Sequence, residues 1–171
     1  MNQLNLQQFV QLFTLNDAAA TQRVSERLTL VLRDPAAYQE QFAEELEERG
    51  VEAELPAQEM RDLALIDALL SEELLWESDW KDPAADLVYG LNETLAQQRR
   101  AVRLDEPAWR RATVTGPEAL DIVQDLLEPL GLALVLFTLD SDSYALSIVA
   151  DAQADEARKM AKELGFGMTV Y

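Results

Sequence analysis

Hydrophobic positions in the first hundred residues recur at the three- and four-residue spacing of amphipathic helices. Leu6, Phe9, Val10 and Phe13 share one helical face, and the spacing continues from Val24 to Leu32. This part of the chain is therefore predicted to be helical.

Two Asp-Pro pairs mark predicted helix starts, because aspartate is a good N-cap and proline suits the first helical turn. Asp34-Pro35 opens a helix with a narrow apolar stripe that we expect Gly50 to end. A further helix is predicted from Pro56 to about Leu70, and Asp82-Pro83 opens the one after it.

The pattern changes after residue 111 to short apolar runs that alternate with helical spacing. The order strand, helix, strand, strand, helix, strand is the split βαβ, ferredoxin-like arrangement. Ala112–Thr115 is its weakest strand, and without it a three-stranded sheet backed by two helices remains. The elements predicted here are strands at 112–115, 132–139, 144–149 and 166–171, with helices at about 115–130 and 151–164.

These patterns predict an α+β protein in which a helical layer precedes a small antiparallel sheet with two helices. We expect a helical region at 1–100, an arginine-rich connection at 101–111 and an α+β region at 112–171, sharing one core. The stretch from Arg99 to Arg111 holds five arginines and two acids, and it is the one basic stretch of the sequence.

Composition removes several classes of chemistry. The 171 residues include no histidine and no cysteine, which excludes Ser-His-Asp and Cys-His catalysis and thiolate metal sites. We expect no cofactor, although a carboxylate-only enzyme stays possible in principle. We expect no secretory signal, because the first residues are amphipathic rather than uniformly apolar. The longest apolar run is Leu132–Phe137, so we expect a cytoplasmic protein without a membrane association.

Acidic residues are concentrated in one segment. Sixteen acids and three bases lie between Glu40 and Asp86, a net charge of −13 within a total of −18. The total opposes binding to nucleic acid, whereas the local excess would attract a basic protein partner. The alternative is a solvated face that keeps the protein soluble. The predicted partner-binding residues are Glu44, Glu45, Glu47, Glu48, Glu72, Glu73, Trp76, Glu77, Asp79 and Trp80.

Trp76 and Trp80 are four residues apart, so they would share a face if this segment were helical. Aromatic side chains ringed by acids are typical of an interaction hot spot. The alternative is that they cover the edge of the core.

Three other aspartates are weaker candidates for chemistry. Asp140 and Asp142, with serines between and after them, could ligate a hard cation, but they equally suit a turn. Asp67 interrupts an apolar helical stretch, where burial would raise its pKa and suit a general acid. A structural ion pair with an arginine from 99–111 is the alternative.

Two stretches carry a family resemblance. They are Leu65-Ile-Asp-Ala-Leu69 with Trp76-Glu-Ser-Asp-Trp-Lys-Asp-Pro83, and Leu136-Phe-Thr-Leu-Asp-Ser-Asp-Ser-Tyr-Ala-Leu146. They resemble an uncharacterised bacterial family, domain of unknown function 6630. The resemblance implies no activity and assigns no residue a role.

Three functions fit these observations. The first is a non-enzymatic protein that binds a basic partner through its acidic segment, as immunity proteins, inhibitors and nucleic-acid mimics do. The second is a small-molecule-binding regulatory module of ferredoxin-like type, which rests on fold analogy. The third is the carboxylate-only enzyme.

Overall fold

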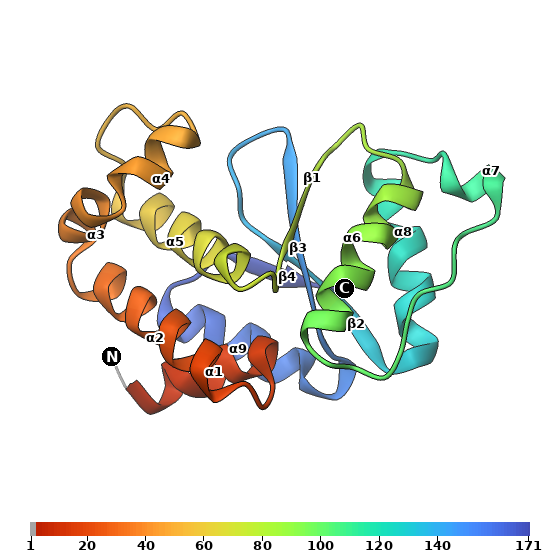
Figure 1. Cartoon of the computed structure of the whole chain (residues 1–171), viewed down its shortest axis with the longest axis horizontal. Coiled ribbons are helices and arrows are strands. Elements are labelled where there is room, and N and C mark those ends of the chain that lie inside the picture. The colour runs from red at the N-terminus through yellow and green to blue at the C-terminus, as the bar shows by residue number, and fades with distance from the viewer. Residues whose placement is uncertain (1–2) are drawn as a thin grey trace.

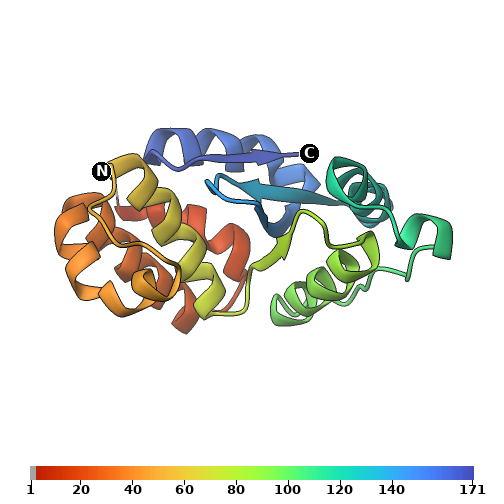
Figure 2. The same ribbon diagram turned by 90° about the horizontal axis from the view of Figure 1, so that it is seen from above.

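A small sheet separates two layers of helices in the computed structural model, which describes residues 3–171 (Figures 1 and 2). The predicted α+β class, with helices first and a small antiparallel sheet later, is confirmed. No helix among residues 3–171 is both long and apolar enough to cross a membrane.

The first layer consists mostly of N-terminal helices and follows the predicted spacing. Tyr38 and Leu46 lie on the buried stripe predicted after Asp34, although the helix is interrupted at Phe42. The Asp34 carboxylate caps its helix by accepting a hydrogen bond from the Ala37 N–H at 3.0 Å. The elements are α1 (Gln3–Thr14), α2 (Ala18–Arg33), α3 (Pro35–Gln41), α4 (Ala43–Glu48) and α5 (Ala57–Ser71).

The sheet is antiparallel throughout, with the strand order β1-β3-β2-β4. Alternate residues of its two central strands enter separate apolar clusters, one with α1, α2, α5 and α9 and one with α6 and α8. Each face is therefore covered by its own helices. The strands are β1 (Trp76–Asp79), β2 (Leu132–Phe137), β3 (Ser143–Ala150) and β4 (Met168–Val170).

The remaining helices lie on both sides of the sheet. α6 and α8 pack on one face, and α9 packs with α1 on the other. Gly131 and Gly165, which directly follow the helices predicted at about 115–130 and 151–164, take positive φ angles and end these helical segments. These elements are α6 (Ala84–Gln97), α7 (Trp109–Ala112), α8 (Gly116–Leu127), α9 (Ala154–Leu164) and the 3₁₀ turns η1 (Glu128–Leu130) and η2 (Asp151–Gln153).

The predicted strand at Ala112–Thr115 is wrong. Ala112 ends the short helix α7, and the next residues lead directly into α8. The ferredoxin-like order that began with this strand is therefore not formed. The predicted three-stranded alternative is present as β2, β3 and β4. A fourth strand, β1, comes from the region expected to be helical and pairs with β3 at the edge of the sheet.

The prediction that Trp76 and Trp80 share a helical face is also wrong. α5 ends at Ser71, and Glu73 takes a left-handed conformation with φ of 59°. The Leu74 N–H then donates to the Leu69 carbonyl at 2.9 Å, which closes the helix in the manner usual for a glycine cap. Because glutamate occupies the glycine position, the sequence gives no sign of this stop before β1.

Candidate functional site

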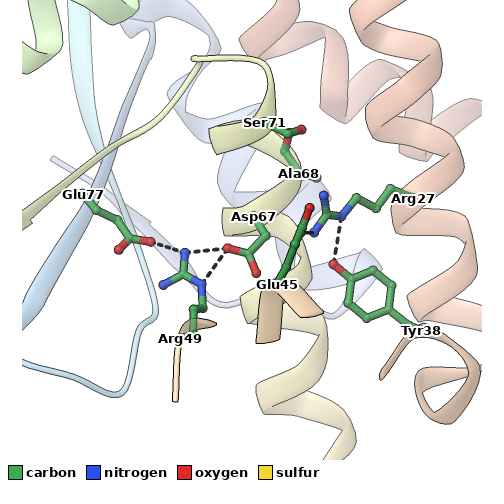
Figure 3. Close-up of polar contacts among 8 residues, drawn as sticks. All are labelled: Arg27, Tyr38, Glu45, Arg49, Asp67, Ala68, Ser71 and Glu77. Carbon is green, nitrogen blue, oxygen red and sulfur yellow. Dashed lines mark hydrogen bonds and ion pairs between the residues drawn. The ribbon is translucent and has the colours of Figure 1, made fainter. Parts of the chain in front are cut away.

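Arg49 connects the end of α4 to α5 and to β1. Its Nε donates to Asp67 Oδ1 at 2.6 Å, its Nη2 lies 2.5 Å from the same oxygen, and Nη2 also pairs with Glu77 (Figure 3). Asp67 is buried, whereas the side chains of Arg49 and Glu77 are about one-fifth to one-quarter exposed. One guanidinium therefore neutralises two carboxylates that come from separate elements.

Arg27 makes a second connection, from α2 to α3 and α4. Its Nε donates to the Tyr38 hydroxyl oxygen at 2.9 Å, and Nη2 pairs with Glu45 (Figure 3). The guanidinium carbon also lies 4.1 Å from the centre of the Phe42 ring, a cation–π contact. Together, Arg27 and Arg49 fix both sides of the α3–α4 segment to the body of the protein.

Burial sets the protonation behaviour of these groups. It raises the pKa of Asp67, and the hydrogen bonds and charge of Arg49 counter that rise only in part. Burial alone would lower the pKa of Arg49, but hydrogen bonds to Glu77 and Asp67 raise it overall. Burial raises the pKa of Tyr38 to about 12, so its phenol stays neutral beside Arg27.

A group of exposed carboxylates on and around α3 and α4 pairs with neither Arg27 nor Arg49. We call this group the acidic corner. Its members are exposed, form no ion pair within residues 3–171, and lie on α3, α4, the loop after them and the start of α5 (Figure 1). Arg49 is the one basic residue between positions 40 and 59, and its charge is directed inward. The acidic corner consists of Glu40, Glu44, Glu47, Glu48, Glu52, Glu54 and Glu59.

The structure divides the predicted acidic partner-binding residues into two groups. Glu45 and Glu77 belong to the arginine connections, and Glu72 accepts two hydrogen bonds from Arg23 at 2.6 and 2.9 Å. Glu44, Glu47, Glu48, Glu73 and Asp79 are exposed and form no ion pair within the described residues. The second group is the part of the prediction that remains available to a partner.

The two tryptophans lie apart from the acidic corner. Trp76 is half-buried against α6, where a Cβ added to Gly90 would lie 2.1 Å from its ring. Trp80 follows β1, is 43% exposed and has the Lys81 ammonium 5.4 Å from its ring centre. Asp79 is exposed and accepts a hydrogen bond from the Lys81 N–H at 2.8 Å.

The arginine-rich stretch lies on the opposite side of the sheet from the acidic corner (Figure 1). Arg111 pairs with Asp125 at 2.9 Å, and within residues 3–171 no arginine from 99–111 pairs with an acid from 40–86. Asp67 does have a structural arginine partner, as predicted, but that partner is Arg49 and not an arginine from 99–111.

Two hollows open beside the Arg49–Glu77 ion pair and share both residues in their walls. The larger, about 480 Å³, also contacts Asp62 and the turn with Asp140 and Ser141. The smaller, about 440 Å³, contacts Glu45, Glu48 and Asp67. Figure 3 shows Asp67 and Glu45 near each other between the two arginines.

The weak metal candidates lie in the turn between β2 and β3. Asp140 and Asp142 are exposed, and the Asp142 carbonyl accepts a hydrogen bond from the Trp80 N–H at 2.9 Å. In the part of the chain that the structure describes, no three carboxylates are arranged to hold one metal ion.

Arg27, Arg49 and Tyr38 belong to this site although the sequence pattern does not point to them. The available signal for Arg49 was that it is the one basic residue between Glu40 and Glu59. Nothing in the spacing connects Arg49 with Asp67 and Glu77, because these pairs span 18 and 28 residues.

Comparisons with known proteins agree with the resemblance noted from the sequence. No curated protein and no solved structure matches the chain. A family model described as Domain of unknown function (DUF6630) matches residues 5–171, which is nearly the whole chain. The chain therefore belongs to the DUF6630 family.

Proposed function

We propose that this protein is a non-enzymatic, cytoplasmic bacterial protein that binds a basic protein partner through its acidic corner, as an immunity protein or inhibitor does. The observation that carries the proposal is the inward direction of Arg49. The fold uses Arg49, the one base between positions 40 and 59, for internal ion pairs and leaves seven exposed carboxylates that form no ion pair within residues 3–171.

Such a surface has a physical cost that a partner would remove. Like charges on successive helical turns repel each other, so the exposed acids oppose the formation of α4. A basic surface would relieve this repulsion and would be steered toward the corner before contact. At physiological ionic strength the Debye screening length is about 8 Å, so the attraction acts mainly when the two protein surfaces are within that distance of each other.

A rigid base supports the same proposal. Arg27 and Arg49 tie the short helices α3 and α4 to α2, α5 and β1. The acidic corner is therefore held in place before a partner arrives, which reduces the ordering cost of binding.

Charge reversal with a matched control tests this function. The corner-reversed variant carries Glu44→Lys, Glu47→Lys and Glu54→Lys and leaves the paired Glu45 intact. The control carries Asp121→Lys, Glu128→Lys and Glu163→Lys, three exposed acids that form no described ion pair. In pull-downs from native cytoplasm at low salt, we expect the control to retain a basic partner that the corner-reversed variant loses. Equal capture by both variants would contradict the proposal.

Small-molecule binding is the second candidate, and the larger hollow favours it. That hollow combines carboxylates with apolar walls from Val51, Leu55 and Leu63. Thermal-shift screening with the Leu63→Trp variant as a filled-hollow control tests this function. A ligand that raises the melting temperature of both proteins equally would not be bound there.

The carboxylate-only enzyme has less support. Burial raises the pKa of both Asp62 and Asp67, but each contacts a different hollow. The Asp62 carboxylate also accepts hydrogen bonds from the Gly167 N–H at 2.7 Å and from Gln58 at 2.9 Å. This arrangement suits a structural role better than a general acid.

A further inference from the structure

One oxygen of Asp67 lacks a hydrogen-bond donor. Oδ1 accepts from Arg49, whereas Oδ2 is buried and has no partner among the described residues. The residue is only 8% exposed. A buried carboxylate oxygen without a donor is unfavourable, so this atom marks a place where a donor from another molecule would be stabilising.

The smaller hollow beside Asp67 is rich in acceptors. Its wall includes the carboxylates of Glu45, Glu48, Asp67 and Glu77, and the donors of Arg49 are directed to two of them. The Ser71 hydroxyl, also in the wall, donates to the Ala68 carbonyl at 2.6 Å, so its oxygen is left as a further acceptor (Figure 3).

The chemistry of the wall selects an organic cation. Within residues 3–171, no three carboxylates converge closely enough to coordinate a single metal ion. An ammonium or guanidinium group can instead donate to several separated oxygens at once. Leu70 adds an apolar contact to the wall, which suits the methylene stem of a basic side chain.

We propose that this hollow receives one lysine or arginine side chain of the basic partner, whose N–H group donates to Asp67 Oδ2. The inference rests on the proposed function and specifies how the partner is held. Glu48 belongs to both the acidic corner and the hollow, so the two surfaces are continuous. Because Asp67 Oδ2 is buried, the proposal requires a side chain of the wall, such as the half-exposed Glu45 that pairs with Arg27, to move aside when the partner binds.

Blocked octalysine and octaarginine peptides are the probes, with octaglutamine as the neutral control, in calorimetric titrations at low salt. Asp67→Asn removes the hollow's buried charge while it keeps its shape. Glu52→Gln removes one charge from the exposed loop and is the matched control. We expect Asp67→Asn to weaken binding about tenfold, and Glu52→Gln about twofold or less, as for one exposed charge.

A second variant keeps the test independent of folding. Ser71→Trp fills the hollow from its exposed rim without a change of charge, and we expect a loss of binding similar to that of Asp67→Asn. Circular dichroism and thermal melting check every variant. If Asp67→Asn fails to fold, the Ser71→Trp result decides.

The corner-reversed variant separates failure of the inference from failure of the proposed function, because it leaves the hollow intact. Suppose that the corner-reversed variant loses binding, whereas Asp67→Asn and Ser71→Trp bind the peptides as well as Glu52→Gln does. This result would contradict binding in the hollow and would still support the acidic corner as the binding surface. If the wild-type protein binds neither basic peptide, both proposals are wrong. If the corner-reversed variant binds as well as wild type, the acidic corner is wrong, and the hollow is wrong too unless Asp67→Asn and Ser71→Trp weaken binding more than Glu52→Gln does.

Discussion

Arg49 and Asp67 join the acid-rich segment to the buried helix α5 through two contacts to one carboxylate oxygen, at 2.5 and 2.6 Å. The pair is central because it neutralises Asp67 inside the protein and at the same time removes the only base from the acidic corner. Its removal should therefore affect stability and surface charge together.

Replacing Arg49 with Met should destabilise the protein strongly. The change leaves Asp67 buried without its cation and Glu77 without its partner, and breaking a buried pair in this way costs about 3–5 kcal/mol. Urea unfolding measures the loss. Arg111→Met is the control, because the Arg111–Asp125 pair is more than half exposed and should contribute less than about 1 kcal/mol.

A double variant separates charge burial from packing. Arg49→Met with Asp67→Leu removes both buried charges, so it should recover much of the stability lost by Arg49→Met alone. If the double variant is as unstable as the single one, the ion pair is not the source of the loss.

Arg27→Lys should loosen the α3–α4 segment although it keeps the charge. The planar guanidinium of Arg27 donates to Tyr38 and Glu45 and at the same time stacks on the Phe42 ring. A lysine ammonium cannot make all three contacts. Loss of these contacts should cost about 1.5–3 kcal/mol. Hydrogen exchange should accelerate in residues 35–48 more than in α9; equal acceleration everywhere would show that Arg27 does not act locally.

Asp67→Asn should reduce the dependence of stability on pH. The pKa of Asp67 is raised in the folded protein, so the folded state binds its proton more readily than the unfolded state does. This group therefore adds stability as the pH falls from neutral toward about 4, and loses that contribution as the pH rises through its folded pKa.

Melting temperatures between pH 7 and about pH 4.5 test this expectation. Arg49, Arg27, Glu45 and Tyr38 all influence Asp67 or its surroundings, so the measure is the difference between the wild-type and variant slopes. A slope that is identical in both proteins would mean that another group causes the pH dependence.

Gly90→Ala should overpack the contact between α6 and β1. The added Cβ would lie 2.1 Å from the Trp76 ring, which must then move, and overpacking of this kind costs about 1–3 kcal/mol. Adding Trp76→Leu should restore part of the stability by removing the ring. Thermal melting compares the three proteins, and an unaffected Gly90→Ala protein would contradict the close packing.

Most of the helical framework follows from local sequence, because side-chain periodicity and caps act over a few residues. The Asp34 cap and the helix ends at Gly131 and Gly165 are of this kind. β1 was missed because Glu73, rather than a glycine, takes the left-handed conformation that ends α5. Its pairing with β3 is a non-local contact that periodicity does not reveal.

The candidate site was predictable only in part for the same reason. A charge count along the chain found the acid-rich segment, but it could not separate the acids that face arginines from those that face solvent. Glu45, Glu72 and Glu77 are paired with Arg27, Arg23 and Arg49, from elements that meet them only in the folded protein.

Zero-length crosslinking in native cytoplasm tests the central claim most directly, because a carbodiimide joins a carboxylate to a lysine amine in contact with it. The proposal predicts crosslinks to another protein that are concentrated at the acidic corner, from Glu40 to Glu59, and that disappear at high salt. Crosslinks concentrated instead on α8 and α9, or spread evenly over the exposed acids, would contradict it.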